Sequence, residues 1–252
     1  MRWIRGKSLW PGTQGSRSRE RLDRSYGRRT TGVQLWLRIA ALGLVLALDP
    51  SLASPSRAVA ADRAAKLVAV GDSLTAGFNL PASAAFPAKL QQALRAKGFA
   101  VEIANAGVSG DTASGGLARL DWSVPEGTDA VILELGANDM LRGIDPKVTR
   151  AALDEIIRRL TERHIGVLLA GMRAVPNLGV AYVEGFEAIY PQLAAKYDLV
   201  YYPFFLGGIA GNPQFNQRDG LHPTAAGVDR IVEGILPKVE ELLRTLRDQK
   251  HD

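Results

Sequence analysis

The chain contains no cysteine among its 252 residues. This absence excludes disulfide bonds, a thiolate nucleophile and cysteine-based metal sites, but it does not fix the compartment, because an exported protein can lack disulfides. Histidine is also scarce, with three residues in total, so histidine chemistry has few candidates. The sequence has no Walker A lysine motif, no strand-linked dinucleotide fingerprint and no clustered metal-ligand spacing. Nothing in it therefore indicates a metal or an organic cofactor.

The formal charge of +5 does not describe most of the chain. The first 60 residues contain 11 Lys and Arg against 3 Asp and Glu, which leaves 20 against 23 for residues 61–252. The larger segment is mildly acidic, so the basic balance gives no support for a nucleic-acid partner.

The apolar run at residues 39–48 is ten residues long and follows Arg38. That length suits the core of an export signal and falls short of the roughly 20 residues of a membrane span. Small residues at Ala58 and Ala60 offer a cleavage site, with Ser51 and Ala53 as a nearer alternative. An uncleaved anchor or a buried helix remains the other interpretation. We expect residues 1–60 to be a basic extension plus signal peptide, residues 61–252 to form one domain, and the mature protein to be periplasmic or secreted, without a stable membrane span.

From about residue 64, short apolar runs alternate with helical patterns. The runs at 67–70, 101–104, 130–135, 165–169 and 199–202 predict strands. Helices are predicted around 86–98 and 185–197, after the N-cap Asp145 with Pro146 behind it, and from Ala225, where Pro237 should kink the helix or separate two helices. This alternation predicts an α/β fold with a doubly wound, mainly parallel, five-stranded sheet. Long loops are expected at 172–183 and 203–223, and loops of that length are usually functional or disordered.

A serine follows the first apolar run at the point where a strand would end. Ser73 comes two residues after Gly71, and ligands of open α/β sheets bind at the carboxyl edge of the strands. A serine hydroxyl needs a neighbouring base to become a nucleophile. Taken alone, the Gly-Asp-Ser tripeptide is more often a turn plus helix cap.

The base can be sought by elimination. His164 lies at the end of a predicted helix and His251 lies in the C-terminal tail, whereas His222 occupies a loop before the last helix, held extended by Pro223. Asp219 precedes it by three residues and could accept a hydrogen bond from one imidazole nitrogen, leaving the other for Ser73. The alternatives are a helix-entry histidine and a common Asp-Gly turn.

Donors for a developing oxyanion also follow strands. Ser73 can offer its backbone N–H at a helix start, Gly110 lets a backbone N–H approach closely, and Asn138 can donate from its side-chain amide. A turn glycine and an Asx cap are the alternatives for the latter two.

Together these blocks resemble the SGNH (GDSL-type) hydrolases, and more closely the bacterial periplasmic lysophospholipase/thioesterase/arylesterase group. The blocks are Gly71-Asp72-Ser73-Leu74, Ser109-Gly110-Asp111-Thr112, Gly136-Ala137-Asn138-Asp139 with Leu141-Arg142-Gly143, Ile189-Tyr190-Pro191, Pro203-Phe204-Phe205 and Asp219-Gly220-Leu221-His222-Pro223. The resemblance spans nearly all of residues 61–252. It implies a flavodoxin-like three-layer α/β/α sandwich without metal or organic cofactor. It makes Ser73 the nucleophile, His222 the base, Asp219 its orienting acid, and Gly110 and Asn138 oxyanion donors beside the Ser73 amide.

Apolar residues on two loops are candidates to bind an acyl chain, unless they pack in the core. They are Met140, Leu141, Ile144, Met172 and Pro176. The sequence therefore predicts a serine esterase that hydrolyses acyl esters (lysophospholipid, aryl ester or acyl thioester) through an acyl-enzyme. A carbohydrate acetylesterase on the same fold and a non-catalytic lipid- or glycan-binding protein remain the alternatives.

Overall fold

The computed structural model describes residues 63–249. The expected signal peptide and the boundary near residue 61 lie outside the described residues, so both stay predictions. Within residues 63–249, none of the helices combines the length and the hydrophobicity needed to cross a membrane.

Five strands form one sheet in the order β2-β1-β3-β4-β5, and every neighbouring pair is parallel. They are β1 (Ala65–Gly71), β2 (Val101–Gly107), β3 (Ala130–Glu134), β4 (Gly166–Ala170) and β5 (Val200–Tyr202). This confirms the doubly wound α/β fold. The first two strands extend beyond the apolar runs that predicted them, because backbone pairing between β1 and β2 continues to Gly71 and Gly107 whatever the side chains are.

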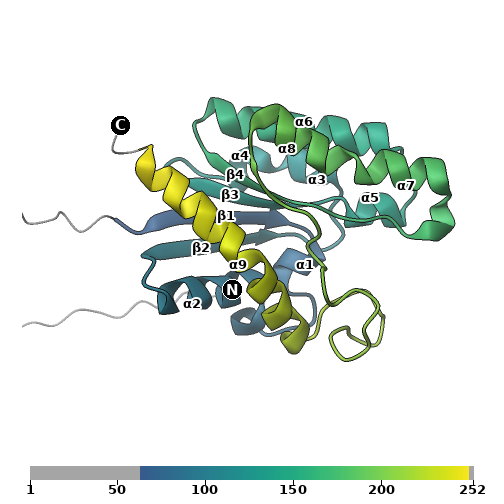
Figure 1. Ribbon diagram of the computed structural model, residues 1–252, viewed down its shortest axis with the longest axis horizontal. Helices are drawn as coiled ribbons and strands as arrows, with labels where there is room; N and C mark the ends of the chain where they lie inside the picture. The colour runs from purple at the N-terminus through teal and green to yellow at the C-terminus, as the bar shows by residue number, and fades with distance from the viewer. Residues whose placement is uncertain (1–62, 250–252) are drawn as a thin grey trace, which may run out of the picture. The chain divides into compact units, whose positions relative to one another are not determined.

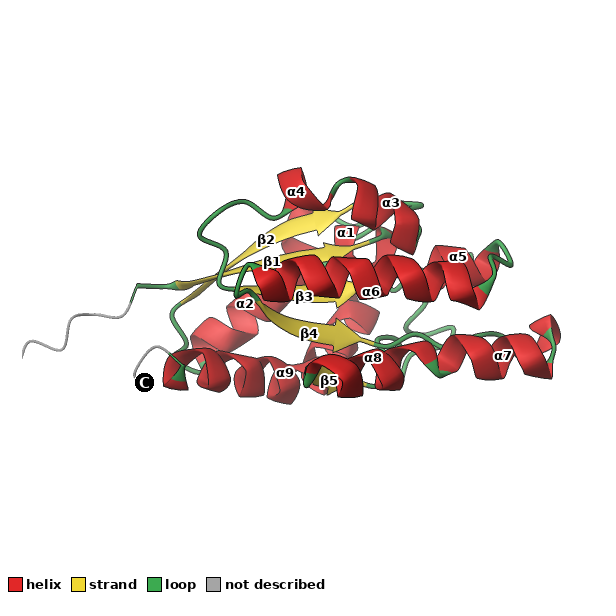
Figure 2. Ribbon diagram, turned by 90° about the horizontal axis from the view of Figure 1, so that it is seen from above, coloured by secondary structure: helices red, strands yellow, loops and turns green. Residues whose placement is uncertain are grey.

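Helices cover both faces of the sheet, which gives the predicted three layers (Figures 1 and 2). One face carries α2 (Phe86–Ala96) and α9 (Ala225–Asp248), which pack on each other. The other face carries α3 (Ala113–Ala118), α6 (Pro146–Glu162) and α8 (Ile189–Tyr197). Short α4 (Leu120–Ser123) follows α3.

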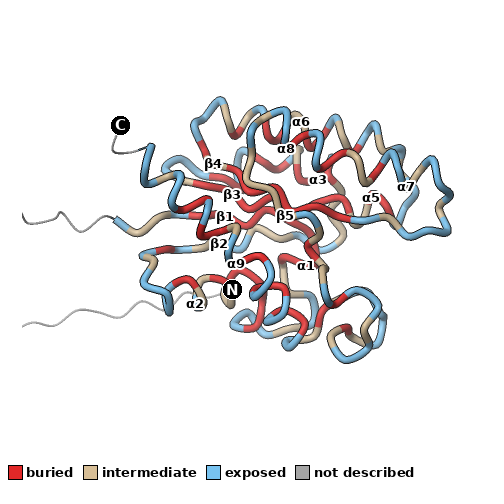
Figure 3. Tube along the Cα trace, viewed as in Figure 1, coloured by how far each residue is buried: buried red, intermediate tan, exposed pale blue. Residues whose placement is uncertain are grey.

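The core lies along the central strands (Figure 3). All five residues of β3 are buried, as expected for a parallel strand covered on both faces. On α6 the predicted apolar face is completely buried, and Asp145 caps the helix by accepting from the Lys147 N–H at 2.9 Å. The buried face of α6 comprises Leu153, Ile156, Ile157 and Leu160.

Two helical predictions need correction. The single helix expected at 185–197 is two helices, α7 (Val180–Glu187) and α8, which meet at Ala188. Pro191 gives the reason, since it has no N–H for the carbonyl of Glu187 and its ring crowds that carbonyl. Consequently the expected loop at 172–183 is shorter and contains the 3₁₀ turn η3 (Pro176–Leu178). Of the two alternatives for Pro237, the separation of two helices is wrong, because α9 runs through Pro237 without a break, whereas the kink stays a prediction.

The strand order reverses between β1 and β3, and this positions the site. The chain leaves β1 toward β2 on one side, while β3 lies on the other, so the loops after β1 and β3 diverge into a crevice at the carboxyl edge. Ser73 follows β1 and Asn138 follows β3. The irregular segment between β5 and α9 was expected as a long loop, and it brings His222 to the same edge.

Candidate active site

The helix α1 (Ser73–Ala76) begins at the serine itself. Asp72 is its N-cap, with Oδ1 accepting from the Leu74 N–H at 2.9 Å, and Gly77 ends it in the left-handed conformation at φ 80°. The cap reading of the Gly-Asp-Ser tripeptide is therefore correct for Asp72. The same cap holds Ser73 in place at the end of β1.

Gly71 allows β1 and α1 to approach closely. A Cβ atom at this position would lie 2.1 Å from Thr75 Oγ1 and 2.6 Å from Glu134 Oε2, distances that no side chain could keep. The glycine is thus required by packing beneath the serine rather than by an unusual backbone angle.

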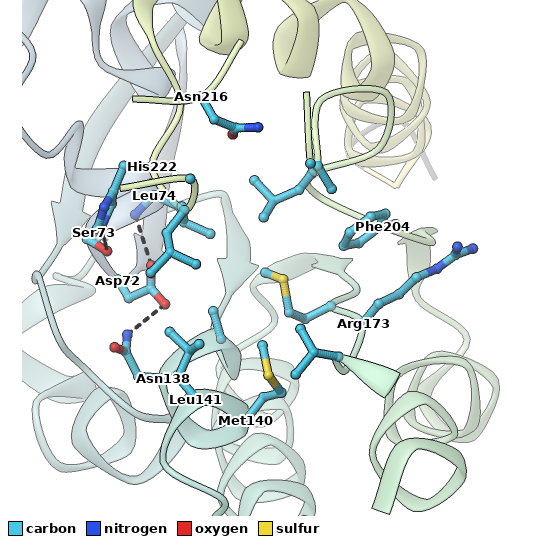
Figure 4. A pocket seen from close by; sticks show the side chains of 18 residues that line it. Asp72, Ser73, Leu74, Asn138, Met140, Leu141, Arg173, Phe204, Asn216 and His222 are labelled. Carbon is cyan, nitrogen blue, oxygen red and sulfur yellow. Dashed lines mark hydrogen bonds between the residues drawn. The ribbon is translucent and has the colours of Figure 1, made fainter. Parts of the chain in front are cut away.

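Ser73, His222 and Asp219 form a continuous hydrogen-bonded chain, of which Figure 4 shows Ser73 and His222. His222 Nε2 lies 2.9 Å from Ser73 Oγ, and Nδ1 lies 2.7 Å from Asp219 Oδ2. Asp219 Oδ1 also accepts from the backbone N–H groups of Leu221 at 2.9 Å and His222 at 3.0 Å. These backbone donors, together with the imidazole, lower the pKa of Asp219 to about 2. His164 follows α6 with φ 56° and is not part of these hydrogen bonds. His251 lies outside the described residues.

The loop that carries His222 is held by contacts that the sequence analysis missed. Gln217 donates its backbone N–H to the His222 oxygen at 2.7 Å, and its side-chain Nε2 donates to the oxygens of Phe78 at 2.8 Å and Pro223 at 2.9 Å. The ring of Phe78 packs on the imidazole with centroids 4.4 Å apart. A Gln or a Phe in a loop carries no periodic signal, so only the tertiary contact identifies them.

Asn138 lies in α5 (Ala137–Leu141), which begins just after the turn that follows β3 at the crevice. Its side-chain Nδ2 donates to Asp72 Oδ2 at 3.0 Å and to the Asp111 carbonyl at 2.9 Å, so both amide hydrogens have acceptors within the protein. Gly110 has φ 85°, which only glycine adopts readily, and its carbonyl accepts from Arg142 at 2.8 Å.

Two buried carboxyl groups lie beneath the serine. Burial raises the pKa of Asp72 to about 6, and the Asp111 charge adds to this, against the opposing hydrogen bonds from the Leu74 N–H and Asn138 and the influence of His222. Burial also raises the pKa of Glu134 well above its usual range. Glu134 is the acidic residue inside the apolar run 130–135, and a charge within an otherwise apolar run is the signal in the sequence that could have identified it.

Arg119 supports the same region from the C-cap of α3. Its guanidinium forms an ion pair with Asp111 and donates to the Gly71 carbonyl and to Ser123 Oγ, both at 2.9 Å. Because Asp111 in turn accepts from Asn138, this arginine links the turn before Ser73 to the amide of Asn138.

A cavity of about 350 Å³ opens beside Ser73 and His222, a size within the usual range for ligand sites. Figure 4 shows Ser73 and His222 at one side, Phe204 and Arg173 at the other, and Met140 and Leu141 between them. Three of the five residues predicted to contact substrate line this cavity: Met140, Leu141 and Met172. It is also lined by Val175, Phe204, Leu206 and Leu221.

Ile144 and Pro176 are not among the residues that line the cavity. The Ile144 carbonyl accepts from the hydroxyl of Tyr182 at 2.9 Å, which holds the end of its loop against α7. Pro176 begins the 3₁₀ turn and is exposed. Spacing after a strand cannot tell which face of an irregular segment turns inward.

Comparisons with known proteins agree with this geometry. The sequence profile of the GDSL-like Lipase/Acylhydrolase family matches residues 69–230. The chain is 38% identical to Esterase TesA of Pseudomonas aeruginosa, over 70% of this chain and 89% of the relative. It is also 38% identical to Thioesterase 1/protease 1/lysophospholipase L1 of Escherichia coli K12, over 74% and 88%. The crystal structure of AlinE4, an SGNH-hydrolase family esterase, superposes with a TM-score of 0.61 at 44% identity, covering 72% of this chain and 97% of that one. The chain therefore belongs to the SGNH, or GDSL-like, family of lipases and acylhydrolases, and it is a carboxylic ester hydrolase.

Proposed function

We propose that the chain hydrolyses acyl esters through a Ser73–His222–Asp219 triad and a covalent acyl-enzyme. The observation that carries this proposal is the unbroken chain of contacts from Ser73 Oγ to His222 and on to Asp219, at 2.9 Å and 2.7 Å. These are hydrogen-bond distances suited to a base that takes a proton from the nucleophile.

In the first half-reaction, Ser73 Oγ attacks the ester carbonyl while its proton moves to His222 Nε2. The Asp219 carboxylate accepts from Nδ1–H and stabilises the imidazolium that forms. The imidazolium then protonates the leaving alcohol as the carbon–oxygen bond breaks. In the second half-reaction His222 takes a proton from water, the resulting hydroxide attacks the acyl-enzyme, and the proton returns to Ser73 Oγ.

The oxyanion of each tetrahedral intermediate would be bound by Asn138, Gly110 and the Ser73 backbone N–H. The contacts of Asn138 constrain this role. An oxyanion must share or displace the hydrogen bond that the amide gives to Asp72 or to Asp111. The amide is thereby already oriented at the crevice, which lowers the cost of reorganisation during the reaction.

The cavity supports an acyl chain as the group that is recognised. Its lining is dominated by apolar side chains beside the nucleophile, among them Met140, Met172 and Phe204. We propose aryl esters, acyl thioesters and lysophospholipids as the substrate class, in keeping with the names of the relatives. An acetylated sugar would leave most of this apolar surface uncovered, and no nucleic-acid partner is proposed.

The test uses protein that begins near residue 61, with a panel of p-nitrophenyl esters, acyl-CoAs, lysophospholipids and acetylated sugars. Ser73→Ala should lower kcat by several orders of magnitude without unfolding the protein, and a serine-reactive phosphonate should label only the wild type. His222→Ala should behave like Ser73→Ala. His164→Asn serves as the matched control, since asparagine tolerates the positive φ of His164. Near-normal hydrolysis by folded Ser73→Ala would end this proposal, and activity confined to acetylated sugars would replace the substrate class.

We propose further that catalysis needs no metal ion. A chelator such as EDTA should leave activity unchanged, because proton transfer by His222 and a hydrogen-bonded oxyanion supply the chemistry. Activity that is lost on chelation and restored by a divalent ion would point to metal-assisted hydrolysis instead.

Export to the periplasm or the medium is the location we propose. The apolar run at 39–48 and the small residues at Ala58 and Ala60 support it. Fractionation of cells that express the full chain, with N-terminal sequencing of the product, should find a protein that begins after Ala60 or Ala53. An uncleaved, membrane-bound chain would contradict this.

A further inference from the structure

A carboxyl side chain lies buried directly beneath the nucleophile. Glu134 is the last residue of β3, and it pairs with Gly71 across the ladder between β1 and β3. Its exposure is 0%, as is that of Asp72 in the turn before Ser73. Neither carboxyl takes part in the proton transfers proposed above. A buried acid at this place therefore needs another explanation.

The contacts of Glu134 join β3 to the turn that holds the serine. Oε2 accepts from Thr75 Oγ1 at 2.8 Å, and the Asp72 N–H lies 3.4 Å from the same oxygen. Asp72 and Thr75 flank Ser73 on its two sides. Gly71 leaves no space for this turn to shift toward β3, since even a Cβ there would lie 2.6 Å from Oε2. Glu134 thus braces the turn from below.

The other oxygen of Glu134 indicates its charge. Oε1 is buried and has no hydrogen-bond partner. The donors on Oε2, Thr75 and the Asp72 N–H, lower the pKa of Glu134, but burial outweighs them. A carboxylate here would still have a buried Oε1 with neither water nor a donor, and this cost favours the protonated form.

The charged and titratable neighbours point the same way. Asp72, from the turn after β1, is a second acid, and its charge raises the pKa of Glu134 further, after burial itself. Arg119, from the end of α3, directs its charge to Asp111. Tyr190, from α8, donates its hydroxyl to the Leu135 carbonyl at 3.0 Å. Among residues 63–249, no ion pair of Glu134 is found.

We propose that Glu134 is a positioning residue that keeps its proton in the folded enzyme and, as a neutral carboxyl, braces the Asp72–Thr75 turn so that Ser73 stays in reach of His222. A neutral carboxyl accepts the Thr75 hydroxyl without placing a second negative charge beside Asp72. The kinetic consequence rests on the proposed role of Ser73, but the protonation state is measurable without turnover.

Infrared spectroscopy tests the protonation state. At about pH 8, above the pKa of Asp72, the wild type should show the C=O stretch of a buried carboxylic acid, and Glu134→Gln should lack it. Glu240→Gln is the matched control. Glu240 is a nearly buried carboxyl on α9 that is paired with Lys97 and Arg244, which lower its pKa, so this variant should retain the band. A wild type without an acid band that depends on Glu134 overturns the proposal.

The pH dependence of stability should have opposite signs in the two variants. A raised pKa in the folded state gives stability that is complete below the ordinary value of 4.5 and is lost as pH rises through the raised pKa. The thermal midpoint of Glu134→Gln, relative to wild type, should therefore increase with pH. Glu240 has a lowered pKa, so its stability is present above 4.5 and is lost as pH falls through the folded pKa. The deficit of Glu240→Gln should shrink as pH falls.

Kinetics test the positioning role. With active sites counted by phosphonate titration, Glu134→Gln should keep kcat within about threefold of wild type, because a neutral acceptor for Thr75 remains. Glu134→Ala should lower kcat about ten- to a hundredfold with little change in KM, as a small displacement of a reacting group does. Thr75→Val removes the hydroxyl that donates to Glu134. It should lower kcat in the same way, and it replaces Glu134→Ala in the test if that variant does not fold. Wild-type kcat per active site in both Glu134→Ala and Thr75→Val overturns the positioning role. An active Ser73→Ala protein would instead contradict the proposed function itself.

Discussion

The side-chain amide of Gln217 donates to the backbone oxygen of Phe78 at 2.8 Å, across 139 positions of sequence. This bond joins the loop that carries His222 to the segment that follows α1. Ser73 is the first residue of α1. The ring of Phe78 also packs on the imidazole of His222, with centroids 4.4 Å apart. His222 and Ser73 are thus held together by contacts outside the hydrogen bonds that link them to each other and to Asp219.

Gln217→Ala should therefore lower kcat, by about tenfold, because the histidine loop loses its tie and the base spends less time in reach of the serine. The measurement is kcat and KM on a p-nitrophenyl ester, with Gln214→Ala as the control from the same loop. Equal losses in the two variants would mean that the loop as a whole, rather than this bond, is sensitive.

Removal of the Asn138 side chain should cost about 10²–10³ in kcat, as the loss of one preorganised oxyanion donor does. Asn177→Ala, at an exposed position of the neighbouring loop, is the control. Phosphonate labelling of Ser73 should persist at a lower rate. If Asn138→Ala raised KM alone, the amide would bind substrate without stabilising the oxyanion.

Asp219→Asn should lower kcat by up to about 10⁴ while substrate binding changes less, because the imidazole loses the carboxylate that orients it. The pKa of about 2 keeps Asp219 ionised across the working range, and the stability from its hydrogen bonds is lost only as pH falls from 3.8 through that value. The wild-type rate should nevertheless fall on acidification, because His222 must be neutral to act as a base. Rate–pH profiles of both proteins check this, and an unchanged rate in the variant would leave a Ser73–His222 dyad.

Arg119→Ala should lower the free energy of unfolding by about 3–5 kcal/mol, because a nearly buried ion pair is broken and Asp111 keeps an uncompensated charge. Denaturant unfolding measures the difference. The control is Arg158→Ala, which removes exposed pairs within α6 and should change stability little. A comparable loss in both would show that burial does not distinguish the two arginines.

Pro237→Ala should raise the free energy of unfolding by about 1–2 kcal/mol, since it restores a backbone hydrogen bond in the middle of α9 and this gain exceeds the lost rigidity of the unfolded chain. Pro146→Ala, at the first position of α6, should bring no such gain, because that N–H has no partner within the helix. A lower thermal midpoint for Pro237→Ala would show that the ring makes packing contacts that matter more.

Local signals in the sequence were sufficient for the order of the elements. Apolar runs identify all five strands, because a parallel strand covered on both faces is a continuous apolar run. Asp145 with Pro146 identifies the start of α6, because capping involves residues close together in the sequence. The break between α7 and α8 was missed although Pro191 lies near it. A proline at this position fits either a continued helix with a kink or the first turn of a new helix. The position of the carbonyl four residues earlier decides between the two, and the sequence does not show it.

The sequence by itself determined the sheet, the family and the candidates Ser73, Asp219 and His222, because a nucleophile and a base have few residue types to choose from in a chain with three histidines. Tertiary structure alone decided which neighbours act on them. Gln217 ties the loop, Glu134 lies beneath the turn, and Ile144 and Pro176 do not line the cavity. The physical reason is distance along the chain. Burial, charge and hydrogen bonding are set by atoms that meet only after parallel strands bring separate loops to one edge of the sheet.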